Sequence, residues 1–136
     1  MCQAQQNKVI VTPPETLTIK RGAGAASALK VNTLPGFHVN SDKPKQDYLI
    51  PLALTWTSGP LKIKSVTYPA PEEIQLGPDT LDVFTGTFDI KTDFSAPSAA
   101  PAGQTVMTGK LHYQACNNRM CFRPATIDVK LPVVVE

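Results

Sequence analysis

Two of the three cysteines stand close together near the C-terminus, in the segment Tyr-Gln-Ala-Cys-Asn-Asn-Arg-Met-Cys-Phe-Arg-Pro at residues 113–124. The four residues between Cys116 and Cys121 predict a turn, because Asn tolerates the left-handed backbone conformation. Opposed residues of an antiparallel pair have Cα atoms about 4.5–5.5 Å apart, and a disulfide spans roughly 4.4–6.8 Å. The spacing therefore predicts that the two sulfurs can bond with little backbone movement.

Local chemistry leaves two interpretations of such a bond open. A disulfide that closes so small a ring contributes only about 2 kcal/mol to the stability of the folded state. A hairpin between neighbouring segments is therefore stabilised little by such a bond. Arg119 and Arg123 stand beside the thiols and would favour the thiolate, which is the reactive form. The pair can therefore be redox-active, or it can be a passive staple in an exported protein.

The stretches on both sides of the cysteines have the alternation of β-strands. Leu111, Tyr113 and Ala115 share one face of residues 105–116, and residues 126–135 alternate in the same way, which predicts a hairpin. Thirteen prolines argue against long helices. Seven or eight strands would fit an antiparallel sandwich, with Trp56 in its core and a surface loop at 94–103. The other predicted strands are 9–12, 29–33, 49–57, 61–67 and 83–93.

Composition limits the classes of protein that the chain can belong to. It has 136 residues, 42% of them hydrophobic, and a net charge of +2. We expect one soluble domain over 8–136 after a flexible tether at 1–7, without affinity for nucleic acid. No apolar run is long enough to span a bilayer. Cys2 resembles the lipidated first residue of a bacterial lipoprotein, although a stray thiol near the chain end is the alternative.

Several short segments, in this order, resemble the N-terminal domain of the bacterial thiol:disulfide interchange protein DsbD. The resemblance runs from about residue 36 to residue 131 and ends in the cysteine pair framed by Tyr-Gln and Pro. Its pieces are Gly-Phe-His-Val-Asn-Ser (36–41), Tyr-Leu-Ile-Pro-Leu (48–52), Val-Thr-Tyr-Pro (66–69), Asp-Val-Phe-Thr-Gly (82–86) and the segment 113–124.

The resemblance implies an all-β, immunoglobulin-like antiparallel β-sandwich with the cysteine pair on a hairpin near the C-terminus. It implies a periplasmic thiol:disulfide oxidoreductase without a cofactor, in which Cys116 and Cys121 exchange electrons and Cys121 is the sulfur attacked in mixed disulfides. Reducing equivalents would pass from a thioredoxin-like donor domain to thioredoxin-fold partners, including disulfide isomerases and cytochrome c maturation proteins. Attachment to the membrane would come only from a lipid at Cys2 or from transmembrane segments outside this chain.

The segment 82–86 resembles the family's cap loop, in which a Phe covers the sulfurs. Phe84 would fill that role, and Asp82 would tune the thiol pKa or accept a proton. The family has a second acidic residue where this chain has Val83, so no second carboxylate is expected there. Tyr113, Arg119 and Arg123 complete the predicted tuning residues. Without the resemblance, Phe84 is interpreted as a core aromatic and Asp82 as a turn residue.

Two other functions stay open at this point. His38, His112, Met107 and Met120 could join the thiols in a soft-metal site for Cu(I), which would make the chain a copper-delivery module. Their spacing follows no known ligand pattern, so we predict no metal site and interpret each histidine as an ordinary surface or hydrogen-bonded residue. The remaining alternative is an immunoglobulin-like interaction module whose disulfide is inert.

Overall fold

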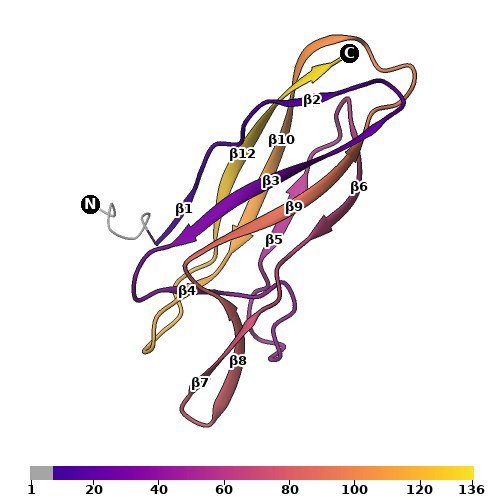
Figure 1. The fold of residues 1–136 in the computed structure, drawn as a ribbon. Helices are drawn as coiled ribbons and strands as arrows, with labels where there is room; N and C mark the ends of the chain where they lie inside the picture. Colours follow the sequence, from indigo (N-terminus) through magenta and orange to yellow (C-terminus); the bar gives the residue numbers. More distant parts are fainter. Residues whose placement is uncertain (1–7) are drawn as a thin grey trace.

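The computed structural model describes residues 8–136; the predicted tether at 1–7 and Cys2 lie outside them. All regular structure in the described part is β-sheet (Figure 1). Within residues 8–136 no helix is long and apolar enough to cross a membrane. The strands are β1 (Val9–Val11), β2 (Leu17–Ile19), β3 (Gly24–Thr33), β4 (His38–Asn40), β5 (Ala53–Trp56), β6 (Lys62–Thr67), β7 (Glu72–Leu76), β8 (Asp79–Phe84), β9 (Thr87–Ser95), β10 (Gly103–Tyr113), β11 (Ala115–Cys116) and β12 (Ala125–Val135).

The strands form three four-stranded sheets, with the orders β1-β3-β9-β6, β2-β12-β10-β5 and β11-β4-β8-β7. In Figure 1 the long strands β3 and β9 run across β10 and β12, and the β7–β8 hairpin projects at the lower end of the molecule. Every pairing is antiparallel except that of β2 with β12. This arrangement confirms the predicted immunoglobulin-like sandwich.

The core lies between the two sheets built on long strands. Buried and exposed residues alternate along most of β10 and β12, as expected for strands with one face inward. Trp56 is partly buried and packs against both main core clusters. Its indole ring meets Phe94 edge-on at 5.2 Å between centroids, and its Nε1 donates a hydrogen bond to Thr92 Oγ1 at 3.0 Å.

Twelve strands are observed over residues 8–136, where seven or eight were predicted, and three of the predicted strands are divided or shortened by several residues. The stretch 105–116 is divided at Gln114 into β10 and β11. The stretch 83–93 is divided into β8 and β9 by a turn at Gly86, whose φ of 70° is a conformation that favours glycine. Thr33 secures this turn, because its Oγ1 accepts a hydrogen bond from Gly86 N at 2.7 Å. The stretch 49–57 forms a strand only over Ala53–Trp56, after Pro51, which has no N–H to donate to a ladder.

Candidate functional site

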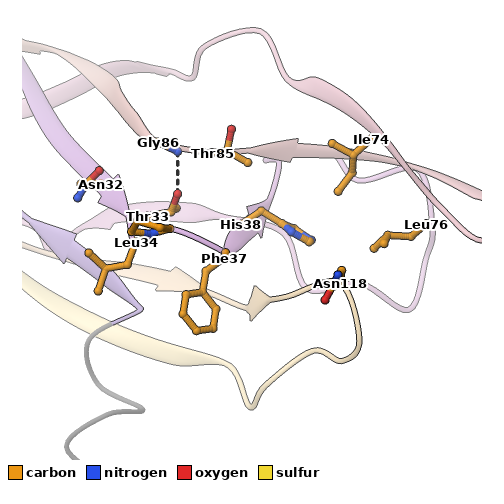
Figure 2. Close-up of a pocket in the computed structure, with 12 residues that line it drawn as sticks. Asn32, Thr33, Leu34, Phe37, His38, Ile74, Leu76, Thr85, Gly86 and Asn118 are labelled. Atoms are coloured by element: carbon orange, nitrogen blue, oxygen red, sulfur yellow. Dashed lines mark hydrogen bonds between the residues drawn. The ribbon is translucent and has the colours of Figure 1, made fainter.

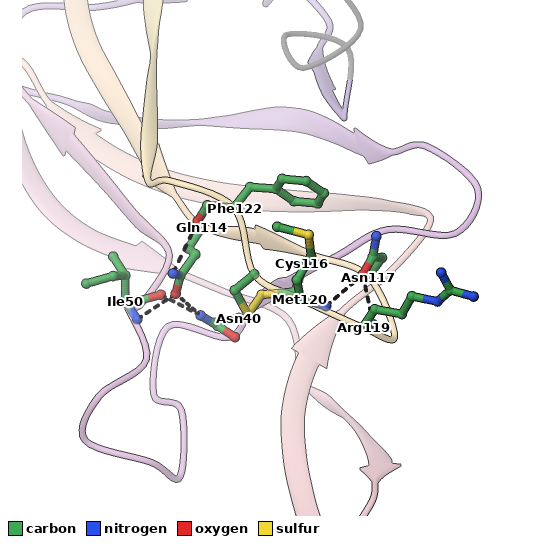
Figure 3. Close-up of a disulfide and its surroundings, with 9 residues drawn as sticks. Asn40, Ile50, Gln114, Cys116, Asn117, Arg119, Met120 and Phe122 are labelled. Atoms are coloured by element: carbon green, nitrogen blue, oxygen red, sulfur yellow. Dashed lines mark hydrogen bonds between the residues drawn. A yellow bond between two sulfur atoms is a disulfide. The ribbon is translucent and has the colours of Figure 1, made fainter.

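Cys116 and Cys121 form a disulfide with an S–S length of 2.06 Å and a Cα–Cα distance of 4.0 Å (Figure 3). The two residues also form an isolated antiparallel bridge. The bond confirms the predicted pair, although the hairpin differs in detail from the prediction. β10 and β12 pair as far as Tyr113 and Ala125, and the chain then enters the third sheet through β11, where Cys116 pairs with β4.

The loop between the cysteines, residues 116–121, is called the cysteine loop here. The Asn117 side chain organises it, because Oδ1 accepts hydrogen bonds from Arg119 N at 2.8 Å and Met120 N at 2.9 Å. Asn117 N also donates to Met120 O at 2.9 Å. An Asn that bonds its own following backbone in this way stabilises a tight turn, and this turn keeps the two cysteines opposite each other.

A partly buried network of amide hydrogen bonds holds the cysteine loop against the sheets. Gln114 Nε2 donates to Phe122 O at 3.3 Å, and Gln114 Oε1 accepts from Asn40 Nδ2 at 3.1 Å and from Ile50 N at 3.2 Å. Asn40 Nδ2 also donates to Ile50 O at 2.9 Å. Gln114 thus ties the two flanks of the loop to β4 and to the segment before β5. Neither Asn40 nor Gln114 was predicted from the sequence to have this role.

The two cysteines differ strongly in exposure. Cys116 is 1% exposed and belongs to the buried interior, whereas Cys121 is exposed. Cys121 lines a groove of about 770 Å³ together with Tyr113, Met120 and Arg123. A thiolate must reach a sulfur directly to exchange with it. Cys121 is therefore the more accessible residue of the pair, and its role as the attacked sulfur stays a prediction.

The groove beside Cys121 has an aromatic and cationic border. Phe122 contributes its ring, with Phe37 at 5.9 Å between ring centroids on one side and Lys8 Nζ at 4.4 Å from the ring centroid. Tyr113 is 5% exposed, and burial raises the pKa of its hydroxyl. Arg119 and Arg123 are exposed. Cationic groups near a thiol favour the thiolate, and tuning of the cysteine pair by the two arginines stays a prediction.

Phe84 lies at the end of β8, 3% exposed, with its ring 4.9 Å from that of Phe88. Its partner across the ladder is Val39 of β4, and the opposite edge of β4 pairs with β11. One strand therefore separates Phe84 from Cys116, and its surroundings are those of a core side chain. Its action as a cap over the sulfurs stays a prediction.

Asp82 lies two residues before Phe84 on β8 and faces a lysine. Its Oδ1 is 3.8 Å from Lys45 Nζ, which makes a closer ion pair of 2.7 Å with Glu73. The hydrogen bond to Glu73 is the main cause that raises the pKa of Lys45. Tuning of the thiols by Asp82 stays a prediction, and Val83, in place of a second carboxylate, is completely buried.

The residues considered for copper do not all lie together. Met107 packs in a different core cluster from Tyr113 and Ala115, and His112 on β10 hydrogen-bonds through Nδ1 to Thr126 Oγ1 at 3.0 Å. Met120 belongs to the cysteine loop, and His38 is the ladder partner of Cys116. No cluster of three or more His, Cys, Asp or Glu in a metal-binding arrangement occurs over residues 8–136.

Fold and site together define an immunoglobulin-like β-sandwich domain that carries a disulfide with one accessible cysteine. A family model described as "Thiol:disulfide interchange protein DsbD, N-terminal" matches residues 7–132. The chain therefore belongs to the family of DsbD N-terminal domains. A search among curated proteins found no match.

Solved structures with the same fold include two related domains. The N-terminal periplasmic domain of ScsB from Proteus mirabilis matches with a TM-score of 0.63 and 14% identity, over 90% of this chain and 44% of that chain. The N-terminal domain of Neisseria meningitidis DsbD in the reduced form matches with a TM-score of 0.51 and 13% identity, over 82% of this chain and 79% of that chain. This chain thus spans less than half of the ScsB chain.

The fold also occurs outside this family. A chain of a type I cohesin–dockerin complex from Clostridium thermocellum matches with a TM-score of 0.51 and 9% identity, over 96% of this chain and 100% of that chain. The sandwich is therefore a common scaffold. Because one fold can support unrelated functions, the function of this chain depends on the cysteine loop and its surroundings.

Proposed function

We propose that residues 8–136 form a periplasmic thiol–disulfide interchange domain. Its reversible Cys116–Cys121 disulfide would take reducing equivalents from a thioredoxin-like donor and pass them to oxidised periplasmic proteins. The observation that carries this proposal is the unequal exposure of the two cysteines, in a chain of the DsbD N-terminal family. An exposed sulfur beside a buried one suits a reaction in which one sulfur is attacked and the other leaves.

The exchange proceeds in two steps in each direction. A donor thiolate attacks Cys121 Sγ, a donor–Cys121 bond forms, and the Cys116–Cys121 bond breaks with its electron pair on Cys116. A second donor thiolate then attacks the donor sulfur of the mixed disulfide and releases Cys121. In the reducing direction, Cys121 attacks an oxidised partner and Cys116 resolves the mixed disulfide. The two cysteines hold both electrons, so the reaction requires no cofactor.

Reduced thioredoxin is a suitable probe of this function. We expect it to open the Cys116–Cys121 bond within minutes, so that peptide mass spectrometry after alkylation finds both residues labelled. The chain would carry Cys2→Ser, so that only the pair is counted. A disulfide that stays closed after prolonged incubation, while urea-unfolded chain is reduced readily, would instead indicate an interaction module with an inert staple.

A further inference from the structure

His38 occupies the position on β4 directly opposite Cys116 on β11. Opposed residues of an antiparallel ladder project to the same side of the sheet, with Cβ atoms about 4.5–5.5 Å apart. His38 is 6% exposed, and its Nε2 is buried without a hydrogen-bond partner. In Figure 2 its ring extends from β4 towards Asn118 of the cysteine loop, in a cavity of about 740 Å³.

A buried polar atom without a partner is unfavourable, and such exceptions in folded proteins often have a functional explanation. An imidazole nitrogen can accept a proton or donate one. Burial lowers the pKa of His38 from its ordinary value of 6.5, which keeps the ring neutral and able to accept a proton at neutral pH.

No charged side chain of residues 8–136 lines the cavity around His38, so the histidine is the proton acceptor there. Its cavity is lined by apolar side chains and uncharged polar ones, including Thr33, Thr85 and Asn118. Five charged side chains belong to the elements around it: Glu72 and Glu73 on β7, Asp79 and Asp82 on β8, and Arg119 on the cysteine loop. Asp79 is exposed, and Glu73 pairs with Lys45. Glu72 on β7 accepts a hydrogen bond from Thr85 Oγ1, Asp82 on β8 faces Lys45, and Arg119 on the cysteine loop is exposed.

We propose that His38 accepts the proton of the Cys116 thiol when Cys116 resolves a mixed disulfide, an inference that rests on the proposed function. The S–H bond of Cys116 breaks and its proton passes to His38 Nε2. The electron pair of Cys116 Sγ forms the bond to Cys121 Sγ, and the bond from Cys121 to the partner breaks. The partner sulfur leaves as a thiolate with the electron pair of the broken bond, and over the two steps the partner disulfide has gained the two electrons that the cysteine pair has lost.

Burial explains why Cys116 needs a proton acceptor and Cys121 does not. A thiol enclosed in a poorly solvated site has a raised pKa, and only the thiolate is nucleophilic. Cys121 is open to water and stands near the exposed Arg119 and Arg123. Cys116 is enclosed, and His38 is its cross-strand neighbour.

Stopped-flow reaction of the reduced Cys2→Ser chain with dithiobis(nitrobenzoate) separates the two steps. Attack by Cys121 releases a first equivalent of nitrothiobenzoate, and resolution by Cys116 releases a second. We expect His38→Gln to slow the second release roughly 10-fold or more at neutral pH. The rate of the first release should stay within about twofold of the parent value. The acidic inflection in the pH profile of the second release rate should disappear. The matched control is His112→Gln, which should change neither release.

An unchanged rate and pH profile of the second release in His38→Gln would overturn the role of His38. A parent chain that releases only one equivalent would overturn the exchange function as well. If His38→Gln does not fold, NMR titration of the His38 ring in the parent chain provides the test. The pKa of the ring should differ between the disulfide and dithiol forms, and identical titration curves would contradict the proposal.

Discussion

Replacing Cys116 with serine is expected to stop exchange completely and to leave the chain covalently attached to its partner through Cys121. The reason is that the exposed Cys121 reacts with the partner first and the buried Cys116 reacts second. Cys121 remains accessible and can attack an oxidised thioredoxin-fold protein, but the sulfur that would release the partner is gone. Non-reducing electrophoresis and mass spectrometry of the adduct would identify Cys121 as the linked residue.

The matched variant is Cys121→Ser, which keeps only the buried cysteine. Because Cys116 is 1% exposed, we expect this variant to form adducts far more slowly than Cys116→Ser under the same conditions. Equal adduct yields from the two variants would contradict the assignment of Cys121 as the attacking sulfur. Both variants would carry Cys2→Ser, so that the N-terminal thiol does not contribute.

Replacing Phe94 with alanine is expected to lower the free energy of unfolding by about 3–5 kcal/mol, as is usual for a large aromatic removed from a packed core. Phe94 is completely buried and meets the Trp56 ring edge-on at 5.2 Å. Since small domains are stable by only about 5–15 kcal/mol, the variant would be close to unfolding. Urea denaturation followed by Trp56 fluorescence measures the change.

Tyr48→Ala is the matched control, because Tyr48 is an aromatic residue that is 71% exposed. Its effect should stay within about 0.5 kcal/mol. The folded fraction of Phe94→Ala should still exchange thiols, since Phe94 packs in a different core cluster from Tyr113 and Ala115 beside the cysteines. A loss of 1 kcal/mol or less in Phe94→Ala would show that the packing around Phe94 contributes little to the stability of the domain.

The parts of the fold that follow from local patterns could be predicted from the sequence. The alternation around Leu111 and along residues 126–135 predicts one inward face on each strand, and the register places Leu111 opposite Ile127. A shift by one residue would turn every buried side chain to solvent, so this pairing is strongly specified. The turn at Asn117 is equally local, because the Asn side chain bonds to its own backbone.

The parts of the fold and of the site that could not be predicted depend on contacts between residues far apart in the sequence. β-Branched residues on both sides of Gly86 concealed the division into β8 and β9. The sequence also contains no local sign that the chain leaves the sheet of β10 and β12 at Gln114. The hydrogen bond that holds Gln114 there comes from Asn40, which is 74 positions away in the sequence. The same change of sheet brings His38 opposite Cys116, a neighbour that the spacing of the cysteines could not indicate.

The reduction potential of the Cys116–Cys121 pair tests the central claim most directly. It can be measured by equilibrating the Cys2→Ser chain in dithiothreitol buffers of graded ratio and counting free thiols after acid quenching. We predict a potential above about −300 mV, in the range of disulfides that open and close in function. A value clearly below that limit would identify a bond that resists reduction, and would contradict thiol–disulfide interchange at this site.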